Sequence, residues 1–240
     1  MNKDYCLTGT KVVIRRLFKQ DFEDILSCYE EYKLLYHNPI NTGFMENIFL
    51  YGEIWGAYLK DNIIGCCYYF PVNSEFFSSS AFCEALKDFI SNSEKYFYMG
   101  YVGIKHGMMS TCDPECPNRP TESGLYQAFM NIAQMQAFRR GFKYIIHASP
   151  VKLRQCSETF FTGGYNLIKI RGLENLVVHY IFAKPVFSEE NIYETDTTAP
   201  PKKILLEDTK KISALLENGY CGVDYSKNDN TMYLCRLITD

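Results

Sequence analysis

Among the four histidines, His147 in a predicted β-strand and His106 shortly after another are candidates for moving a proton near neutral pH. His147 lies in the apolar run 143–148, and strand alternation points it to the opposite face from its two neighbours. His106 follows a second predicted strand, residues 96–104. A histidine in a cleft can act as a general base, whereas a histidine in a core is a packing residue held by hydrogen bonds. Both interpretations stay open for these two side chains.

A predicted helix that begins at Ser123 has the features of an anion-binding site. Its apolar residues recur at helical spacing, and Gly141 ends it. Gly124 lies in the first turn, where backbone N–H groups lack partners within the helix and the helix dipole is positive. This turn therefore predicts a phosphate site, to which Arg119 in the preceding loop could add a positive charge. The alternatives are an ordinary helix-start glycine and a solvated arginine.

The cysteines do not form a zinc-binding pattern. Cys112 and Cys116 are separated by three residues, but no second pair of Cys or His follows at the spacing of structural zinc sites. We therefore predict no metal. Because the first residues lack the apolar stretch of an export signal, we expect the ten cysteines to be reduced thiols in a cytoplasmic protein.

Composition narrows the class of protein. The chain has 240 residues, of which 47% are hydrophobic and 22% are charged, as in globular proteins with one sizeable core. A formal net charge of −3 argues against a broad nucleic-acid-binding face. No apolar run reaches the roughly 18 residues that span a bilayer. We therefore expect neither a nucleic-acid nor a membrane partner.

Apolar periodicity and turn signals predict the elements that position these side chains. Asp21, with Asp24 three residues later, resembles the capping box of a helix that runs to about residue 35. Asp61-Asn62 is the predicted turn of a β-hairpin. The predicted strands are 11–17, 53–60, 63–70, 96–104, 143–148, 165–170 and 176–182, and the further helices are 80–92, 123–140 and 150–161. Residues 105–122 form a long loop, which is typical of a functional or a disordered segment.

This order predicts an α/β fold with a mixed, mostly antiparallel central sheet flanked by helices, and a small C-terminal α/β extension. We assign residues 1–183 to the main domain and the polar, proline-containing segment 184–203 to a linker. In residues 204–240 a strand turns into a helix, and a final strand follows. Such a short segment cannot supply its own core, so we expect it to dock on the main domain or on a second copy in a homodimer.

The segment from Ser123 to Ile145 resembles the cofactor-binding segment of the GNAT superfamily of acyl-CoA-dependent N-acyltransferases. In that family a Gly-rich turn opens a helix that ends in an Arg-Gly pair, as Arg140-Gly141 does here. The order of predicted elements over about residues 11–183 is similar to that of the family, and Gly164-Tyr165 resembles its Gly-aromatic pair. The resemblance implies that acetyl-CoA or another acyl-CoA binds at Val102, Gly103, Ile104, Arg119, Ser123, Gly124, Leu125 and Tyr126.

The sequence departs from the family pattern at two functional positions. The family's phosphate turn carries Arg or Gln, Gly and Gly where Thr121, Gly124 and Tyr126 stand here, so one glycine is kept. The family's tyrosine, which gives a proton to the leaving thiolate, falls on Phe160, and phenylalanine cannot donate a proton. The side chains that could replace it are Ser149, Ser157 and Tyr126, while His147 or His106 would take the proton of the amine.

The resemblance implies an N-acyltransferase that moves an acetyl or other acyl group from acyl-CoA to an amine by direct attack in a ternary complex. The expected acceptor is a small molecule or peptide that carries an amine. Two alternatives stay open because a glycine and the tyrosine are lost: a non-catalytic acyl-CoA-binding module and a protein-interaction domain. The aromatic runs 68–70 and 96–98 belong either to the core or to an apolar acceptor or acyl pocket.

Overall fold

The computed structural model describes residues 3–5, 12–30, 42–72, 95–105, 122–151, 154–173, 177–187, 195–196 and 198–238. Its contacts divide the chain into two compact units. Unit 1 comprises residues 1–78 and 98–133, and unit 2 comprises residues 79–97 and 134–240. Strand β5 (Tyr96–Ile104) and helix α6 (Glu122–Arg139) each begin in one unit and end in the other. The domain boundaries drawn from the sequence stay a prediction.

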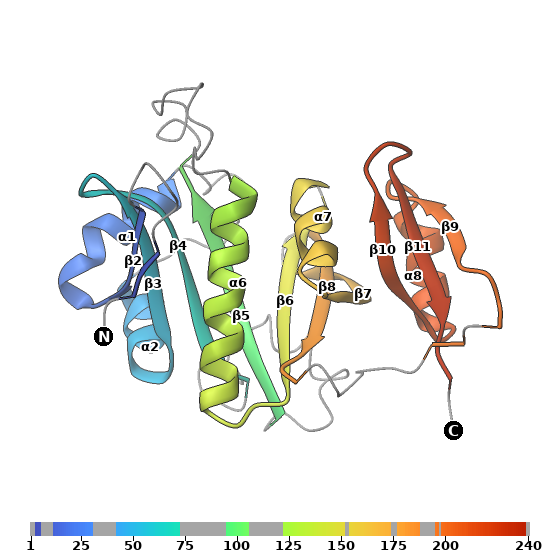
Figure 1. Ribbon diagram of the computed structural model, residues 1–240, viewed down its shortest axis with the longest axis horizontal. Helices are drawn as coiled ribbons and strands as arrows, with labels where there is room; N and C mark the ends of the chain where they lie inside the picture. Colours follow the sequence, from blue (N-terminus) through green and yellow to red (C-terminus); the bar gives the residue numbers. More distant parts are fainter. Residues whose placement is uncertain are drawn as a thin grey trace. The chain divides into compact units, whose positions relative to one another are not determined.

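The strands of unit 1 follow the spatial order β1 (Lys3–Tyr5), β2 (Val12–Leu17), β3 (Glu53–Leu59), β4 (Asn62–Pro71) and β5 (Figure 1). β1 to β4 pair antiparallel with their neighbours, which confirms the predicted hairpin. β4 and β5 also run in opposite directions. The N–H of Lys105, just after β5, donates to Ile64 near the start of β4 at 2.8 Å, while Gly100, earlier in β5, lies against Tyr68.

The turn of this hairpin lies one residue earlier than predicted. Its two central residues are Lys60 and Asp61, with φ of 48° and 65°, instead of Asp61 and Asn62. Two positive φ values are characteristic of a type I′ turn, which matches the twist of paired strands. Asn62 is the first residue of β4 and pairs with Leu59.

The structure describes three helical segments between β2 and β3. They are the 3-10 helix η1 (Lys19–Asp21), α1 (Phe22–Glu30) and α2 (Thr42–Tyr51). The role predicted for Asp21 is wrong, because its carboxylate accepts the N–H of Phe18 at 2.8 Å and so caps η1 instead of pairing with Asp24. The sequence analysis missed α2, which has neither an acidic residue in its first turn nor a basic one in its last.

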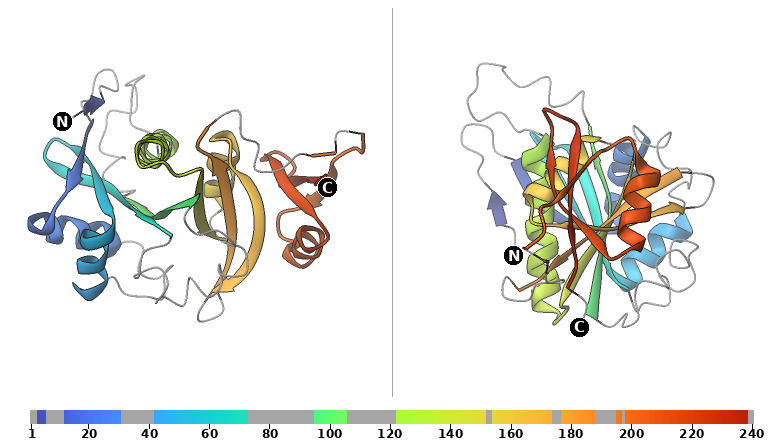
Figure 2. Two further views of the ribbon diagram at one scale, coloured as in Figure 1. Left: turned by 90° about the horizontal axis from the view of Figure 1, so that it is seen from below. Right: turned by 90° about the vertical axis from the view of Figure 1, so that its right-hand side faces the viewer.

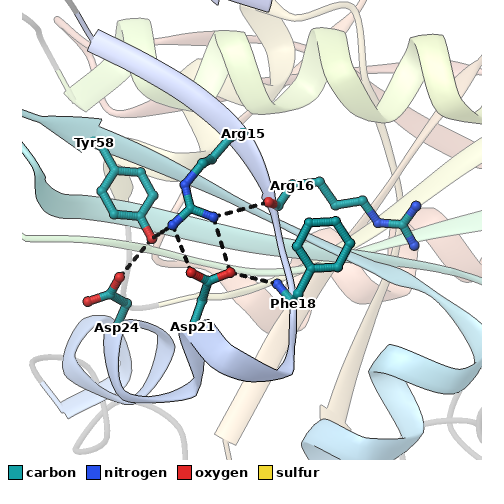
Figure 3. A network of polar contacts seen from close by, with 6 residues as sticks. All are labelled: Arg15, Arg16, Phe18, Asp21, Asp24 and Tyr58. Atoms are coloured by element: carbon teal, nitrogen blue, oxygen red, sulfur yellow. Dashed lines mark hydrogen bonds and ion pairs between the residues drawn. The ribbon is translucent and has the colours of Figure 1, made fainter. Parts of the chain in front are cut away.

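A polar network holds η1 and α1 against the sheet (Figure 3). Asp21 accepts two hydrogen bonds from the guanidinium of Arg15 on β2, at 2.7 and 3.1 Å. Arg15 also donates to the hydroxyl of Tyr58 on β3 at 3.0 Å, and this hydroxyl donates to the Asp24 carboxylate at 2.8 Å. The bond from Arg15 lowers the pKa of Asp21, whereas burial and the bond to Asp24 raise the pKa of Tyr58. At neutral pH the carboxylate is therefore ionised and the phenol protonated, as the network requires.

The two faces of the unit 1 sheet carry different helices. On β4, Cys66 contacts Cys28 of α1, whereas Tyr69 donates to the backbone carbonyl of Phe129 in α6 at 2.9 Å. Alternate residues of a strand point to opposite faces. α1 and α2 therefore pack on one face of this sheet, and the first part of α6 packs on the other (Figure 2).

The described strands of unit 2 follow the spatial order β6 (Tyr144–Pro150), β8 (Val177–Pro185), β7 (Asn166–Leu173), β10 (Tyr220–Ser226), β11 (Thr231–Arg236) and β9 (Lys202–Leu205). These neighbours pair antiparallel. Helix α7 (Arg154–Thr162) begins four residues later than predicted, because Pro150 is the last residue of β6. The rings of Phe160 and Phe161 in α7 pack on Phe182 of β8, with centroids 5.1 and 5.4 Å apart.

The C-terminal segment continues unit 2. β9 leads into α8 (Thr209–Glu217), and β10 and β11 form a hairpin, of which the sequence analysis missed β10. β10 pairs with β7 at Gly222 and Leu167, and α8 packs on both strands. A Cβ at Gly222 would lie 2.8 Å from the Cβ of Leu167, so the close approach needs glycine here. Tyr180 of β8 donates its hydroxyl to the carbonyl of Leu206 at 2.8 Å.

Helix α6 begins at Glu122, so Ser123 lies inside the first turn and not at the cap where it was predicted. Gly141 follows the helix with a φ of 77°, which confirms the predicted end. The predicted helix 80–92 and residues 106–121 of the predicted loop lie outside the described residues. Among the helices that the structure describes, none is long and apolar enough to cross a membrane.

Candidate functional site

The segments predicted to bind acyl-CoA both belong to unit 1. β5 ends at Ile104, which is buried together with Gly103, and Val102 precedes them in the same strand. Gly65 of β4 lies beside this end, where a Cβ would come within 2.8 Å of the Gly103 carbonyl oxygen. The absence of a side chain at Gly65 therefore lets the β5 backbone lie tightly against β4.

The first turns of α6 supply the second part of the predicted cofactor site. Ser123 and Gly124 lie in the first turn, with Gly124 half-buried, and Leu125 and Tyr126 are buried. Backbone N–H groups at a helix start, together with the positive end of its dipole, form a donor set that suits a pyrophosphate. The residues present therefore fit the phosphate part of an acyl-CoA. Arg119 lies outside the described residues.

His147 lies in the aromatic core of unit 2. Its ring stacks on Phe160 with centroids 4.1 Å apart, and only 4% of the residue is exposed. Phe160 is fully buried and also contacts Phe182 and the edge of Tyr165. The position where the family resemblance expects a proton-donating tyrosine is thus a packing position here. The burial of His147 fits a core histidine, and its role as a base stays a prediction.

The other catalytic candidates also stay predictions. Ser149 is buried in β6, Ser157 lies in α7, and Tyr126 lies in α6. His106 lies outside the described residues. Unit 1 therefore carries the described part of the cofactor segment together with Tyr126, whereas His147 and the two serines belong to unit 2.

The buried thiols of unit 1 are not poised for nucleophilic attack. Cys28, Cys66 and Cys67 are free thiols and are buried. A hydrogen bond with Cys28 and burial raise the pKa of Cys66 well above its usual value, and burial does the same for Cys67. Because the thiolate is the nucleophile, both side chains are inert at neutral pH. Within the described ranges no three His, Cys, Asp or Glu residues gather as metal ligands.

The two aromatic runs, residues 68–70 and 96–98, do not all belong to one cluster. Tyr68, Phe70 and Tyr98 form one aromatic cluster in unit 1, with ring centroids 5.0 to 6.4 Å apart. Tyr68 and Phe70 share the α1 face of β4 with Cys66 by alternation. In unit 2 the ring of Phe97 stacks on Phe142, so it belongs to core packing.

Lys105 is a polar residue of this face that the sequence analysis did not single out. Its ammonium donates to the hydroxyl of Ser27 in α1 at 2.8 Å. The two residues are 78 positions apart, so no local pattern could pair them. The one available signal is the position of Lys105 directly after a strand, as the first residue of the predicted long loop 105–122.

Replacing Gly100 with alanine should destabilise the protein by about 1–3 kcal/mol, because the new Cβ would overlap the ring of Tyr68. In a Tyr68→Ala background the same change should cost at least about 1 kcal/mol less, since the overlap is gone. Denaturant unfolding of the two single variants and the double variant measures this coupling. The control is Gly43→Ala, at an exposed position of α2, whose effect should not depend on Tyr68. Additive costs at Gly100 and Tyr68 would contradict the packing.

No protein-family model and no curated protein matches this sequence. Solved structures match it at low identity. YncA of Salmonella typhimurium, assigned as an acetyltransferase and solved with its cofactor acetyl-CoA, has 10% identity and a TM-score of 0.53, over 75% of this chain and 96% of its own. FeeM, an N-acyl amino acid synthase from uncultured soil microbes, has 12% identity and a TM-score of 0.53, over 74% and 92%.

The GNAT domain of S. lividans PAT has 14% identity and a TM-score of 0.50, over 76% of this chain and 97% of its own. These matches cover about three quarters of the chain, which is also the share over which the sequence resembles the family. The predicted α/β class and the mostly antiparallel strand pairing agree with them. The chain has the fold of the GNAT acetyltransferases.

Proposed function

We propose that this chain is an N-acyltransferase that moves an acyl group from an acyl-CoA to an amine. The observation that carries the proposal is the GNAT-like fold, in which the end of β5 and the start of α6 belong to one compact unit. Backbone N–H groups at a strand end and at a helix start are the kinds of donor that suit a thioester carbonyl and a pyrophosphate. The solved neighbours named as an acetyltransferase and an N-acyl amino acid synthase support acyl transfer to an amine.

The proposed roles follow from these positions. Acyl-CoA would supply an activated carbonyl carbon with a thiolate as its leaving group. The first turn of α6 around Gly124 binds the phosphates, and the end of β5 around Gly103 orients the acyl group. A thiol with a pKa near 8.5 leaves without strong assistance, so the core position of Phe160 is compatible with turnover. In unit 1, Tyr126 is the described candidate to replace the missing acid. His106 is the candidate to take the amine proton, by its place in the sequence after β5.

One observation favours a second candidate function, a non-catalytic acyl-CoA-binding module. Phe160 is fully buried in an aromatic cluster, so a general acid is missing at the position where the resemblance expects one. Loss of general-acid catalysis costs on the order of 10²–10⁴ in rate. Release of the CoA thiol in the presence of an amine panel separates the two functions, because a binding module would take up acyl-CoA without consuming it.

The Gly124→Glu variant should weaken CoA binding at least tenfold, because a carboxylate in the first turn of α6 would occupy the phosphate position and repel it. Calorimetric titration of CoA into the wild-type chain and the variant measures the difference. Gly43→Glu is the matched control, since it places the same charge at an exposed position near the start of α2. Equal affinities of wild type and Gly124→Glu, or no binding to either, would overturn the proposed cofactor site.

A further inference from the structure

We propose that Cys221 and Cys235 are a reversible thiol–disulfide pair that links strands β10 and β11 under oxidising conditions. The two strands are neighbours in the C-terminal segment of unit 2 (Figure 1). Both cysteines are free thiols in the structure. The reaction partner is a low-molecular-weight disulfide such as oxidised glutathione. The inference does not depend on the proposed function.

The strand register places the two cysteines directly opposite each other. Cys221 is the partner of Cys235 in the antiparallel pairing of β10 with β11, so both side chains lie on the same face. Two residues further along, the N–H of Leu237 donates to the carbonyl of Gly219 at 2.8 Å. Because hydrogen-bonded and non-hydrogen-bonded pairs alternate, the cysteines form a hydrogen-bonded pair, whose Cα atoms lie about 5.5 Å apart. Disulfides bridge Cα separations of roughly 4.4–6.8 Å, so the backbone spacing suits a cross-link.

The two side chains must move closer before a bond can form. Opposite Cβ atoms in a sheet are about 4.5–5.5 Å apart, whereas a disulfide joins Cβ atoms at about 3.8 Å. The register shift between Gly222 and Asp224, next to Cys221, increases the local twist and interrupts the regular pairing. Closure therefore leaves strain in the hairpin, and a strained disulfide is easily reduced. The pair is suited to reversible oxidation and not to a permanent structural bridge.

The two thiols differ in their access to a reagent. Cys235 is half-buried, whereas Cys221 is only 1% exposed. Burial raises the pKa of both thiols, and the nearby Cys235 raises the pKa of Cys221 further. Both groups are therefore protonated at neutral pH and react slowly. The effect of Cys235 on Cys221 agrees with the closeness that the register gives.

The exchange proceeds in two steps in which thiols and disulfides balance. The Cys235 thiol loses its proton, its sulfur attacks one sulfur of oxidised glutathione, and a glutathione thiolate leaves. The Cys221 thiol then loses its proton, and its sulfur attacks Sγ of Cys235 and releases the second glutathione thiolate. Two cysteine thiols are thus oxidised to one disulfide, while one glutathione disulfide is reduced to two thiols, which take up the two protons.

A second pair of cysteines provides an internal control. Cys28 and Cys66 are hydrogen-bonded to each other in unit 1, but they are 0% and 5% exposed. A reagent of the size of glutathione cannot reach either sulfur without local unfolding. We therefore expect this pair to stay reduced under conditions that oxidise Cys221 and Cys235.

The test maps disulfides in the folded full chain after equilibration with oxidised and reduced glutathione. After an acid quench, the remaining thiols are alkylated in denaturant and the chain is digested with trypsin. Cleavage after Lys and Arg leaves each cysteine of the pair alone in its own peptide, residues 212–227 and 228–236. Mass spectrometry should find these peptides linked in most molecules at the glutathione poise of the endoplasmic reticulum, and separate at the poise of the cytosol. Cys28 should be alkylated in both buffers.

Two variants test the order of attack. In Cys221→Ala the second thiol is missing, so the mixed disulfide of Cys235 with glutathione should accumulate at least about tenfold above its wild-type level. In Cys235→Ala the buried Cys221 should stay free of glutathione. Thermal unfolding of each reduced variant checks that it is folded at the assay temperature.

Absence of the linked peptides from the oxidised wild type, or equal linkage of Cys28 with Cys66, would overturn the proposal. Linkage that persists at the cytosolic poise would contradict a reversible pair, because it would identify a permanent bridge. Equal amounts of mixed disulfide in wild type and Cys221→Ala would show that the two thiols do not pair.

Discussion

A chain that ends at residue 190 is expected to lose more than about 10 °C in melting temperature, or to be insoluble. The deletion removes β9, α8, β10 and β11, which cover β7 and β8 within unit 2. Leu167 of β7, fully buried against Gly222, becomes exposed, and the Tyr180 hydroxyl loses its acceptor. Each buried aliphatic side chain contributes about 1.5–3 kcal/mol, so the total loss is comparable to the 5–15 kcal/mol that stabilises a typical protein.

The measurement is thermal unfolding of the 1–190 fragment and of the full chain, together with the oligomeric state of the fragment. Tyr180→Phe isolates one contact and should cost about 1–2 kcal/mol, because the Leu206 carbonyl loses its donor. Tyr233→Phe is the matched control on β11 and should change the unfolding free energy by less than about 0.5 kcal/mol. A monomeric fragment that melts with the full chain would show that the C-terminal segment is an independent appendage.

Replacing Asp21 with asparagine should lower the free energy of unfolding by about 2–3 kcal/mol at neutral pH. The carboxylate accepts two hydrogen bonds from Arg15 and one from the Phe18 N–H, and its side chain is 9% exposed (Figure 3). Arg15→Met should cost a similar amount, because it leaves the carboxylate without its cation. Arg16→Met is the control, since Arg16 is 46% exposed and lies 3.5 Å from Glu53, so its loss should cost less than about 0.5 kcal/mol.

The difference in unfolding free energy between wild type and Asp21→Asn should depend on pH, and the pKa of Asp21 sets its direction. The hydrogen bond from Arg15 lowers the pKa of Asp21 in the folded state below its unfolded value of about 3.9. The stabilisation is therefore complete above about pH 5 and is lost as the pH falls through the folded pKa. Urea unfolding at several pH values should show a constant difference between wild type and Asp21→Asn from pH 6 to 8, and a smaller one below pH 4. A difference that does not shrink in acid would contradict the ionic role of Asp21.

Several elements follow from the sequence because their signals are local. Short-range apolar periodicity predicts β2, the β3–β4 hairpin, β6 and α6. Two glycines with positive φ end helices, Gly141 at 77° and Gly164 at 80°. The missed elements lack such signals. α2 has no charged residues at its ends, and β10 contains a bulge between Gly222 and Asp224 that breaks its alternation. Asp21 was misassigned because its partner Arg15 lies on a strand and not in the helix.

The sequence by itself determined the fold class and the chemical character of the segment around Gly124, because a helix start with its glycine is encoded in adjacent residues. Only the tertiary structure decided which side chains face one another. It buries Phe160 against His147, lays Tyr68 over Gly100 and joins Lys105 to Ser27. The physical reason is that strand pairing and helix docking bring together residues tens of positions apart. Their contacts depend on register and face, which no short-range pattern in the sequence records.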